Sequence, residues 1–357
     1  MHNKIFGALF MLALSLLMTN CSDNPASSPE SNTATDGGIL SKPPQQPPGN
    51  ANPAIAFVSP YQVKRNLTVS AIYVMDANGA NTTKVYARYT PSSSDYVDFP
   101  TWSSDATKLC VNVNGKDLYR MNIGLVNGYP VTSNDVKIAD GVADGGEYCK
   151  GVWNPAPNAQ EIAVVWRPTS GSQALRMVPI SGSPKSTLYT SPSTDYIIND
   201  DIAFSPDGLK LAFTELQQST GYNFLKIIER STGTVVKTVD LSQYYRITGL
   251  TWGKSPGSTM VAITVIPTLC GKEKDNLFSI DISAATPVPA LLLSGYGAQD
   301  VSFAPGDQSF AFVCLAMWGQ QANGCWFGHA KSAVYTLNPP GLTYPFTGFG
   351  SNFDWKR

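Results

Sequence analysis

The chain has 357 residues, of which 43% are hydrophobic and 14% charged, and its formal net charge is −1. A chain of this length can bury a large core. A net charge this close to zero gives no basic surface of the kind that binds nucleic acid, so we predict no nucleic-acid partner. The 30 Gly, the 26 Pro and the scarcity of long helical patterns favour β-structure.

The first 20 residues predict a signal peptide of a bacterial lipoprotein. Lys4 supplies a positive charge, and the apolar stretch from Ile5 to Met18 is shorter than the roughly 20 residues that a membrane-spanning helix needs. The stretch ends in Leu-Met-Thr-Asn-Cys, which resembles a lipobox, although Asn20 stands where Gly or Ala is usual. We expect residues 1–20 to be removed and Cys21 to carry the lipid. The alternative is an ordinary secretory signal with a chance cysteine.

The residue after Cys21 is Ser22, not the Asp that favours retention at the inner membrane, so we expect a lipid anchor in the outer membrane, on either of its faces. Loss of Lys4 would leave 24 of the 25 Lys and Arg residues against 26 Asp and Glu residues. Attachment to the membrane should therefore come from acyl chains and not from a basic patch.

Residues 21–53 predict a disordered tether. The segment lacks aromatic residues and is rich in Pro, Ser and Asn, so it cannot bury enough surface to offset the entropy of ordering. A flexible chain of this length has an average reach of roughly 30 Å. We therefore expect the domain at residues 54–357 to be held away from the membrane.

From Ile55 onwards a short apolar strand that ends in Trp or Phe recurs, usually followed by a turn and a second apolar strand. The intervals between these aromatic residues are 51, 51, 48, 51 and 52 residues. A period of about 50 residues is typical of a four-stranded propeller blade. We call these residues the anchor aromatics: Trp102, Trp153, Phe204, Trp252, Phe303 and Trp355.

The last anchor lies almost at the C-terminus, whereas the segment Ile55–Ser59 matches the second strand of the other repeats and has no anchor strand before it. The two ends therefore complete one blade, which closes the ring without an open sheet edge. The sequence predicts an all-β fold, a six-bladed β-propeller with four-stranded blades closed by the N- and C-terminal strands.

Three segments carry a family resemblance: IYVMDANGANTTKV, DFPTWSSDATKL and DLYRMN. They resemble the PD40 (WD40-like) repeat of the TolB family, over about residues 55–357. The resemblance implies a propeller that binds peptides or proteins at the mouth of its channel. TolB proteins carry an α/β domain before the propeller, whereas here only the tether lies between Cys21 and Ile55.

No catalytic motif is found. The chain contains two histidines, His2 and His329, and His2 lies in the expected signal peptide, so a multi-histidine metal site is excluded. No Gly-x-Ser-x-Gly elbow or C-x₂-C zinc motif occurs. We therefore predict a binding protein, not an enzyme, with no cofactor except a structural Ca²⁺.

Four carboxylates precede anchor aromatics at strand starts that approach the channel: Asp98, Asp200, Asp201 and Asp300. They could give one mouth a negative charge, bind Ca²⁺ or hold a basic peptide end. The alternative is that they cap turns through backbone hydrogen bonds. A second candidate is the loop from Met317 to Trp326, where Trp318 and Trp326 could bind a partner or pack into the neighbouring blade.

With Cys21 lipidated, five cysteines remain: Cys110, Cys149, Cys270, Cys314 and Cys325. Cys314 and Cys325 flank a predicted hairpin loop and are the first choice for a disulfide in an exported protein. The alternative is that the cysteines stay reduced as small buried residues.

The sequence thus predicts a cell-envelope lipoprotein whose propeller is a scaffold for an envelope protein or peptide. The alternative is a glycan-binding or glycan-cleaving propeller that uses the carboxylates at the channel mouth. A third hypothesis is a purely structural ring stabilised by a metal.

Overall fold

The computed structural model describes residues 52–64, 67–77, 80–88, 95–266, 276–294, 298–320, 326–337, 340–343 and 351–355. All elements in this part of the chain are β-strands. None of its residues forms a helix that could span a membrane. The predicted signal peptide, Cys21 and the tether up to residue 51 lie outside the described residues.

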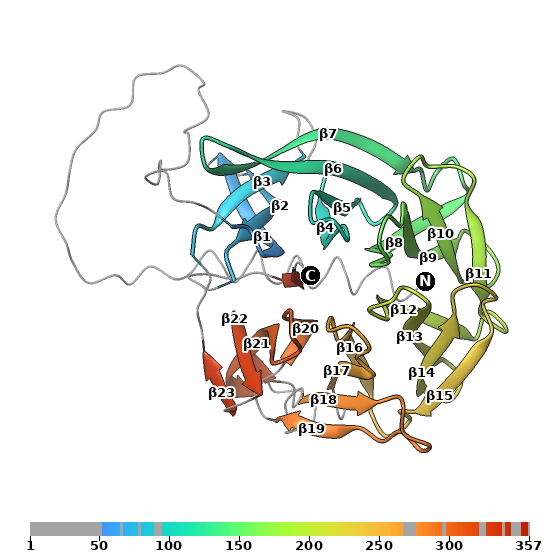
Figure 1. Ribbon diagram of the computed structural model, residues 1–357. Coiled ribbons are helices and arrows are strands. Elements are labelled where there is room, and N and C mark those ends of the chain that lie inside the picture. Colours follow the sequence, from blue (N-terminus) through green and yellow to red (C-terminus); the bar gives the residue numbers. More distant parts are fainter. Residues whose placement is uncertain are drawn as a thin grey trace. The chain divides into compact units, whose positions relative to one another are not determined.

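The strands form six four-stranded antiparallel sheets within the described residues, arranged around a common centre (Figure 1). The first strand of each sheet lies nearest the centre and contacts the first strands of two other sheets. Five of these strands end at an anchor aromatic that leads into a turn, and the sixth ends at Trp355. These inner strands are β4 (Val97–Trp102), β8 (Gly146–Trp153), β12 (Tyr196–Phe204), β16 (Arg246–Trp252), β20 (Ala298–Phe303) and β24 (Ser351–Trp355).

Three further strands follow outwards in each sheet. The second strands are β1 (Ile55–Lys64), β5 (Lys108–Val113), β9 (Glu161–Pro168), β13 (Lys210–Gln217), β17 (Met260–Ile266) and β21 (Ser309–Gln320). The third strands are β2 (Leu67–Met75), β6 (Asp117–Val126), β10 (Ala174–Pro179), β14 (Tyr222–Glu229), β18 (Asn276–Asp281) and β22 (Trp326–Leu337). The outer strands are β3 (Thr83–Ala87), β7 (Tyr129–Ala139), β11 (Ser186–Thr190), β15 (Val235–Asp240), β19 (Ala290–Leu293) and β23 (Pro340–Thr343).

Second strands such as β9 and β17 are buried on both faces. In β9 the residues Ile162–Trp166 are all buried, and in β17 so are Val261–Val265. A strand in a sheet with one solvated face would alternate between apolar and polar residues. The continuous apolar runs of these strands therefore reflect sheets that are covered on both sides by their neighbours.

The sheet that contains both ends of the domain pairs β24 with β1. Ile55 lies opposite Trp355 and Ala56 opposite Asp354 in this antiparallel pair. The inner strand β24 also contacts the inner strands β4 and β20 of the two neighbouring sheets. The C-terminal strand therefore completes the sheet that begins the domain, as the sequence predicts.

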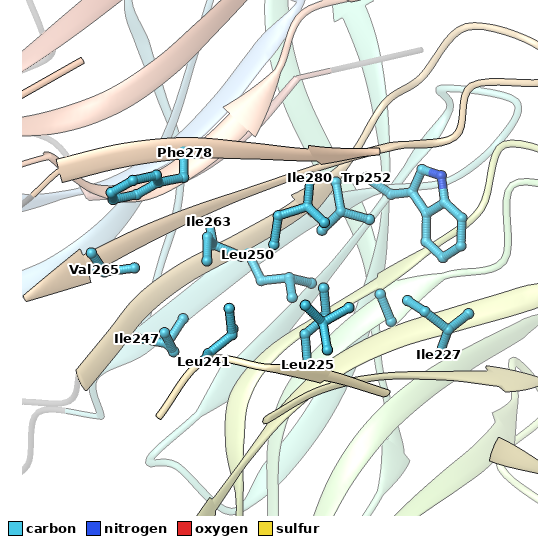
Figure 2. Close-up of a cluster of buried hydrophobic side chains, with 13 residues drawn as sticks. Leu225, Ile227, Leu241, Ile247, Leu250, Trp252, Ile263, Val265, Phe278 and Ile280 are labelled. Atoms are coloured by element: carbon cyan, nitrogen blue, oxygen red, sulfur yellow. The ribbon is translucent and has the colours of Figure 1, made fainter. Parts of the chain in front are cut away.

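The anchor aromatics are buried between neighbouring sheets, each with 2 to 6% of its surface exposed. Figure 2 shows one such contact, where Trp252 and Leu250 of β16 lie in one apolar cluster with Leu225 and Ile227 of β14. Trp252 also donates a hydrogen bond from its indole Nε1 to the carbonyl of Ser258, 2.9 Å away in the following turn. The anchors therefore join successive sheets, and the architecture is a β-propeller with four-stranded antiparallel blades.

We expect Trp252→Ala to lower the free energy of unfolding by about 3–5 kcal/mol, because it leaves a cavity between two sheets. Val288→Ala, at an exposed position, is the matched control and should change the free energy by less than about 0.5 kcal/mol. Urea denaturation of both variants tests this, and a loss below about 1 kcal/mol for Trp252→Ala would contradict the role of the anchors.

Candidate functional site

The inner strands present one repeated position to the channel, three residues before each anchor. Four of the residues at this position lie in β-bulges, which turn their side chains out of the regular alternation. Phe99 and Asp300 have backbone φ values of 50° and 49°, which residues other than Gly rarely adopt. The residues at this position whose surroundings are described are Phe99, Lys150, Asp201, Gly249 and Asp300.

Lys150 and Asp201 form an ion pair within the channel, with 2.6 Å between Nζ and Oδ1. The ammonium of Lys150 also lies 5.7 Å from the centre of the Phe99 ring. Burial alone would lower the pKa of Lys150, but the neighbouring Asp201, Asp300 and Asp354 raise it above its ordinary value. Lys150 is therefore a stable cation that compensates the carboxylates around it.

A second ion pair lies at the other end of the channel, where the inner strands finish. Lys254 follows β16, has a side chain only 6% exposed, and places its Nζ 3.0 Å from Oδ1 of Asp354 in β24. The other oxygen of Asp354, Oδ2, accepts a hydrogen bond of 2.7 Å from the backbone N–H of Trp102 in β4. One carboxylate thus links three sheets.

The residue before each anchor is small or polar because its side chain reaches the neighbouring inner strand. Thr251 accepts a hydrogen bond from the backbone N–H of Phe303 (3.4 Å), and Ser302 accepts one from that of Trp355 (3.2 Å). Asp354 occupies the same position and makes the corresponding bond to Trp102. These bonds satisfy backbone groups that are buried between sheets.

The channel encloses a cavity of about 70 Å³, lined by five of the six anchors, by the residues before all six, and by Lys150 and Lys254. About 10–15 Å³ of space of this kind holds one water molecule, so the cavity has room for a few waters. We therefore expect a larger ligand, such as a peptide or a sugar, to be recognised at a mouth of the channel.

Asp200 lies at the mouth where the inner strands begin, not in the channel beside Asp201. Its Oδ1 is 2.6 Å from Nη2 of Arg167, at the end of β9. Burial, followed by the negative charge of Asp200, raises the pKa of Cys149 well above its usual range. Asp200 is therefore paired with a cation and lies near a buried thiol.

Asp98 lies at the same mouth, at the start of β4. Its Oδ1 accepts a hydrogen bond of 2.9 Å from the backbone N–H of Phe99. The nearby Tyr96 has its pKa raised to about 12 by burial and then by the charges of Asp98 and, among others, Glu147 and Asp200. We call Tyr96, Asp98, Glu147, Arg167 and Asp200 the entrance group.

The four predicted carboxylates thus occupy two different places. Asp201 and Asp300 share the repeated channel position, whereas Asp98 and Asp200 lie one residue earlier and belong to the entrance group. The local hydrogen bond of Asp98 matches the alternative in which these residues cap the backbone. No set of three or more His, Cys, Asp or Glu side chains in the described part of the chain is arranged to hold a metal ion.

Sequence reasoning missed the cations of the site, Lys150, Arg167 and Lys254, and the carboxylate of Asp354 as a link between sheets. A position-by-position comparison of the repeats could have found Lys150, because it aligns with Asp201 and Asp300. Lys254 and Arg167 lie outside the inner strands, and no repeated pattern marks them.

Several predicted residues cannot be placed. Cys325 lies outside the described residues, as do the side chains of Cys314, Trp318 and Trp326. The disulfide between Cys314 and Cys325 and the partner loop thus stay predictions. Cys110 and Cys149 are free and buried, which confirms the reduced alternative for these two cysteines.

No family model and no curated protein matches the sequence. Solved structures do match the fold. The putative TolB from Agrobacterium tumefaciens superposes with a TM-score of 0.57 at 13% identity, over 85% of this chain and 91% of the other. TolB from Acinetobacter baumannii gives a TM-score of 0.54 at 15% identity, over 86% of this chain and 67% of the other. At this level of identity the likeness shows the β-propeller fold alone.

We expect Asp354→Asn to lower the free energy of unfolding by about 3 kcal/mol, because Lys254 would keep a buried charge without its carboxylate. The asparagine oxygen can still accept from Trp102, so the change isolates the ion pair. The double variant with Lys254→Met should recover part of the loss in a double-mutant cycle. Additive losses in urea denaturation would show that the two groups are not coupled.

We expect Cys110 and Cys149 to resist alkylation by iodoacetamide at pH 8 in the folded protein. Burial raises the pKa of Cys110 from 9.0 to about 12, which lowers the reactive thiolate fraction about a thousandfold. Peptide mass spectrometry should find both cysteines labelled rapidly in urea and slowly without it. Equal labelling rates in the two conditions would contradict the buried positions.

Proposed function

We propose that the protein is a lipid-anchored scaffold of the bacterial cell envelope that binds a protein or peptide at the entrance group. The six sheets are, in this proposal, the six blades of one closed ring. The observation that carries it is the contrast between the two regions of the channel. Its interior holds room for a few waters, whereas the entrance group gathers charged side chains and a half-exposed tyrosine at a mouth.

The direction of the N-terminal segment supports the entrance as the binding face. The backbone N–H of Asn52 donates to Oδ1 of Asp76, which directly follows the end of β2, and Ile55 pairs with Trp355 at the end of β24. The chain therefore enters the domain at the face where the inner strands finish. The entrance group lies at the face where they begin, opposite the point at which the chain enters the domain.

The composition of the entrance group suits a protein ligand. Tyrosine and arginine are the residue types enriched at the centres of protein interfaces. Tyr96 and Arg167 are both partly exposed, and three carboxylates surround them. Such a surface offers hydrogen bonds and an aromatic face together.

The carboxylates fit glycoside hydrolysis less well. That chemistry needs one carboxyl group that is protonated near neutral pH and a second that is ionised. Asp201 is already paired with Lys150 and Asp200 with Arg167, so a substrate would have to displace these cations before either carboxylate could act on it. We therefore prefer the scaffold function to the glycan-cleaving function.

A photo-crosslinking amino acid at Val142 tests the proposal in living cells. Val142 is 76% exposed in the loop that leads into β8, beside the entrance group, whereas Leu209, 59% exposed, is the matched control in a turn at the opposite face. We expect a discrete adduct with one envelope protein from position 142 and none from position 209. Adducts from position 209 alone, or from neither position, would overturn the proposal.

A further inference from the structure

The corner of the entrance between β4, β5 and β8 offers a hydrogen-bond acceptor without a donor. Asn112 is only 1% exposed. Its Nδ2 donates to the carbonyl oxygens of Tyr148 and of Cys149, the latter at 3.1 Å. Its Oδ1 is buried and accepts no hydrogen bond from any residue that the structure describes. A buried polar atom without a partner costs about 1–3 kcal/mol, so its retention calls for an explanation.

The orientation of the amide is fixed by its neighbours. Both partners of Nδ2 are carbonyl oxygens, which can only accept, so a rotated amide would set oxygen against oxygen. Oδ1 is therefore turned away from these carbonyls of β8. The group that completes the site must donate a hydrogen bond.

Asp98 lies next to this acceptor. It is the direct partner of Asn112 in the antiparallel pair of β4 and β5, and residues opposite each other in such a pair project to the same face of the sheet. The Asp98 carboxylate and the Asn112 oxygen therefore face the same side, towards β8. Glu147, at the start of β8, adds a second negative charge near this corner.

The charges of the entrance group favour a cation. Asp98, Glu147 and Asp200 carry three negative charges, and Arg167, which is bound to Asp200, carries one positive charge. The ligand of this corner should thus combine a hydrogen-bond donor with a positive charge, on a stem thin enough to pass between strands. Guanidinium and ammonium groups have these properties and have no acceptor.

We propose that Asp98, Asn112 and Glu147 form a site for one cationic head group, that of an arginine or lysine side chain presented by the partner. The inference rests on the proposed function and names the chemistry by which that partner is recognised. The head group donates to Asn112 Oδ1 and is attracted by the two carboxylates, while the rest of the partner lies over Tyr96. Neutral or acidic segments gain no attraction from the two carboxylates.

The test uses n-butylguanidinium as the probe and n-butylurea as its uncharged counterpart, with the purified full-length protein. Saturation-transfer NMR observes the probe and suits weak binding. We expect a saturable signal for n-butylguanidinium that falls at least fivefold for Asp98→Asn combined with Glu147→Gln, and little signal for n-butylurea. High salt should weaken the wild-type signal, because exposed charges are screened.

Asp195→Asn is the control, since Asp195 is a partly exposed carboxylate on the same face, hydrogen-bonded to Ser219, and its loss also removes a negative charge. It should leave the signal unchanged. Asn112→Leu should abolish the signal, and where this variant fails to fold, the Asp98 and Glu147 variants decide alone. No wild-type signal, as expected if a water molecule satisfies Asn112, or equal signals for all variants would overturn the inference.

The outcomes separate this inference from the scaffold function. A crosslinked partner at Val142 together with no binding of n-butylguanidinium would support the scaffold function and contradict the cation site. Binding of n-butylguanidinium without any crosslinked partner would support the cation site and contradict the scaffold function.

Discussion

The structure depends on one constraint: sheets whose central strands are apolar on both faces need a neighbour on each side. The buried runs of β9 and β17 show how strict this requirement is, since an open end would expose such a face to water. A row of sheets satisfies it only when its two ends meet. The two ends meet at β24, which pairs with β1 and contacts the inner strands β4 and β20. The apolar faces of the end sheets are therefore buried only when the ring of sheets is closed.

Closure also explains the polar chemistry at the centre. The inner strands converge on the axis, so the residue before each anchor must be small, and its backbone neighbours are cut off from water. Thr251, Ser302 and Asp354 meet both demands, because each reaches the backbone N–H of an anchor on the next strand. Asp354 alone brings a charge to this position, and the buried Lys254 compensates it. This ion pair thus lies where the two ends of the domain are paired.

The repeated features of the fold could be predicted, whereas the features that occur once could not. The anchors recur about every 50 residues and share one environment, so their spacing alone indicates the propeller, its four-stranded blades and the pairing of Ile55 with Trp355. The carboxylates were found by their position before the anchors, but their partners come from distant parts of the chain. Arg167 meets Asp200 across a sheet boundary and Lys254 meets Asp354 a hundred residues away. Such pairs follow from the way that sheets stack, which a linear pattern does not contain.

The charged side chains inside the channel and those of the entrance group have different consequences for ligand binding. Inside the channel, Lys150 and Lys254 are each bound to a carboxylate, and a ligand that displaced either pair would have to replace a largely buried interaction. The interior is in this sense already occupied by the protein's own side chains. In the entrance group three carboxylates face one guanidinium, and the buried amide oxygen of Asn112 accepts no hydrogen bond from any residue that the structure describes. A cationic ligand would supply that donor, so the physical balance favours binding at the entrance.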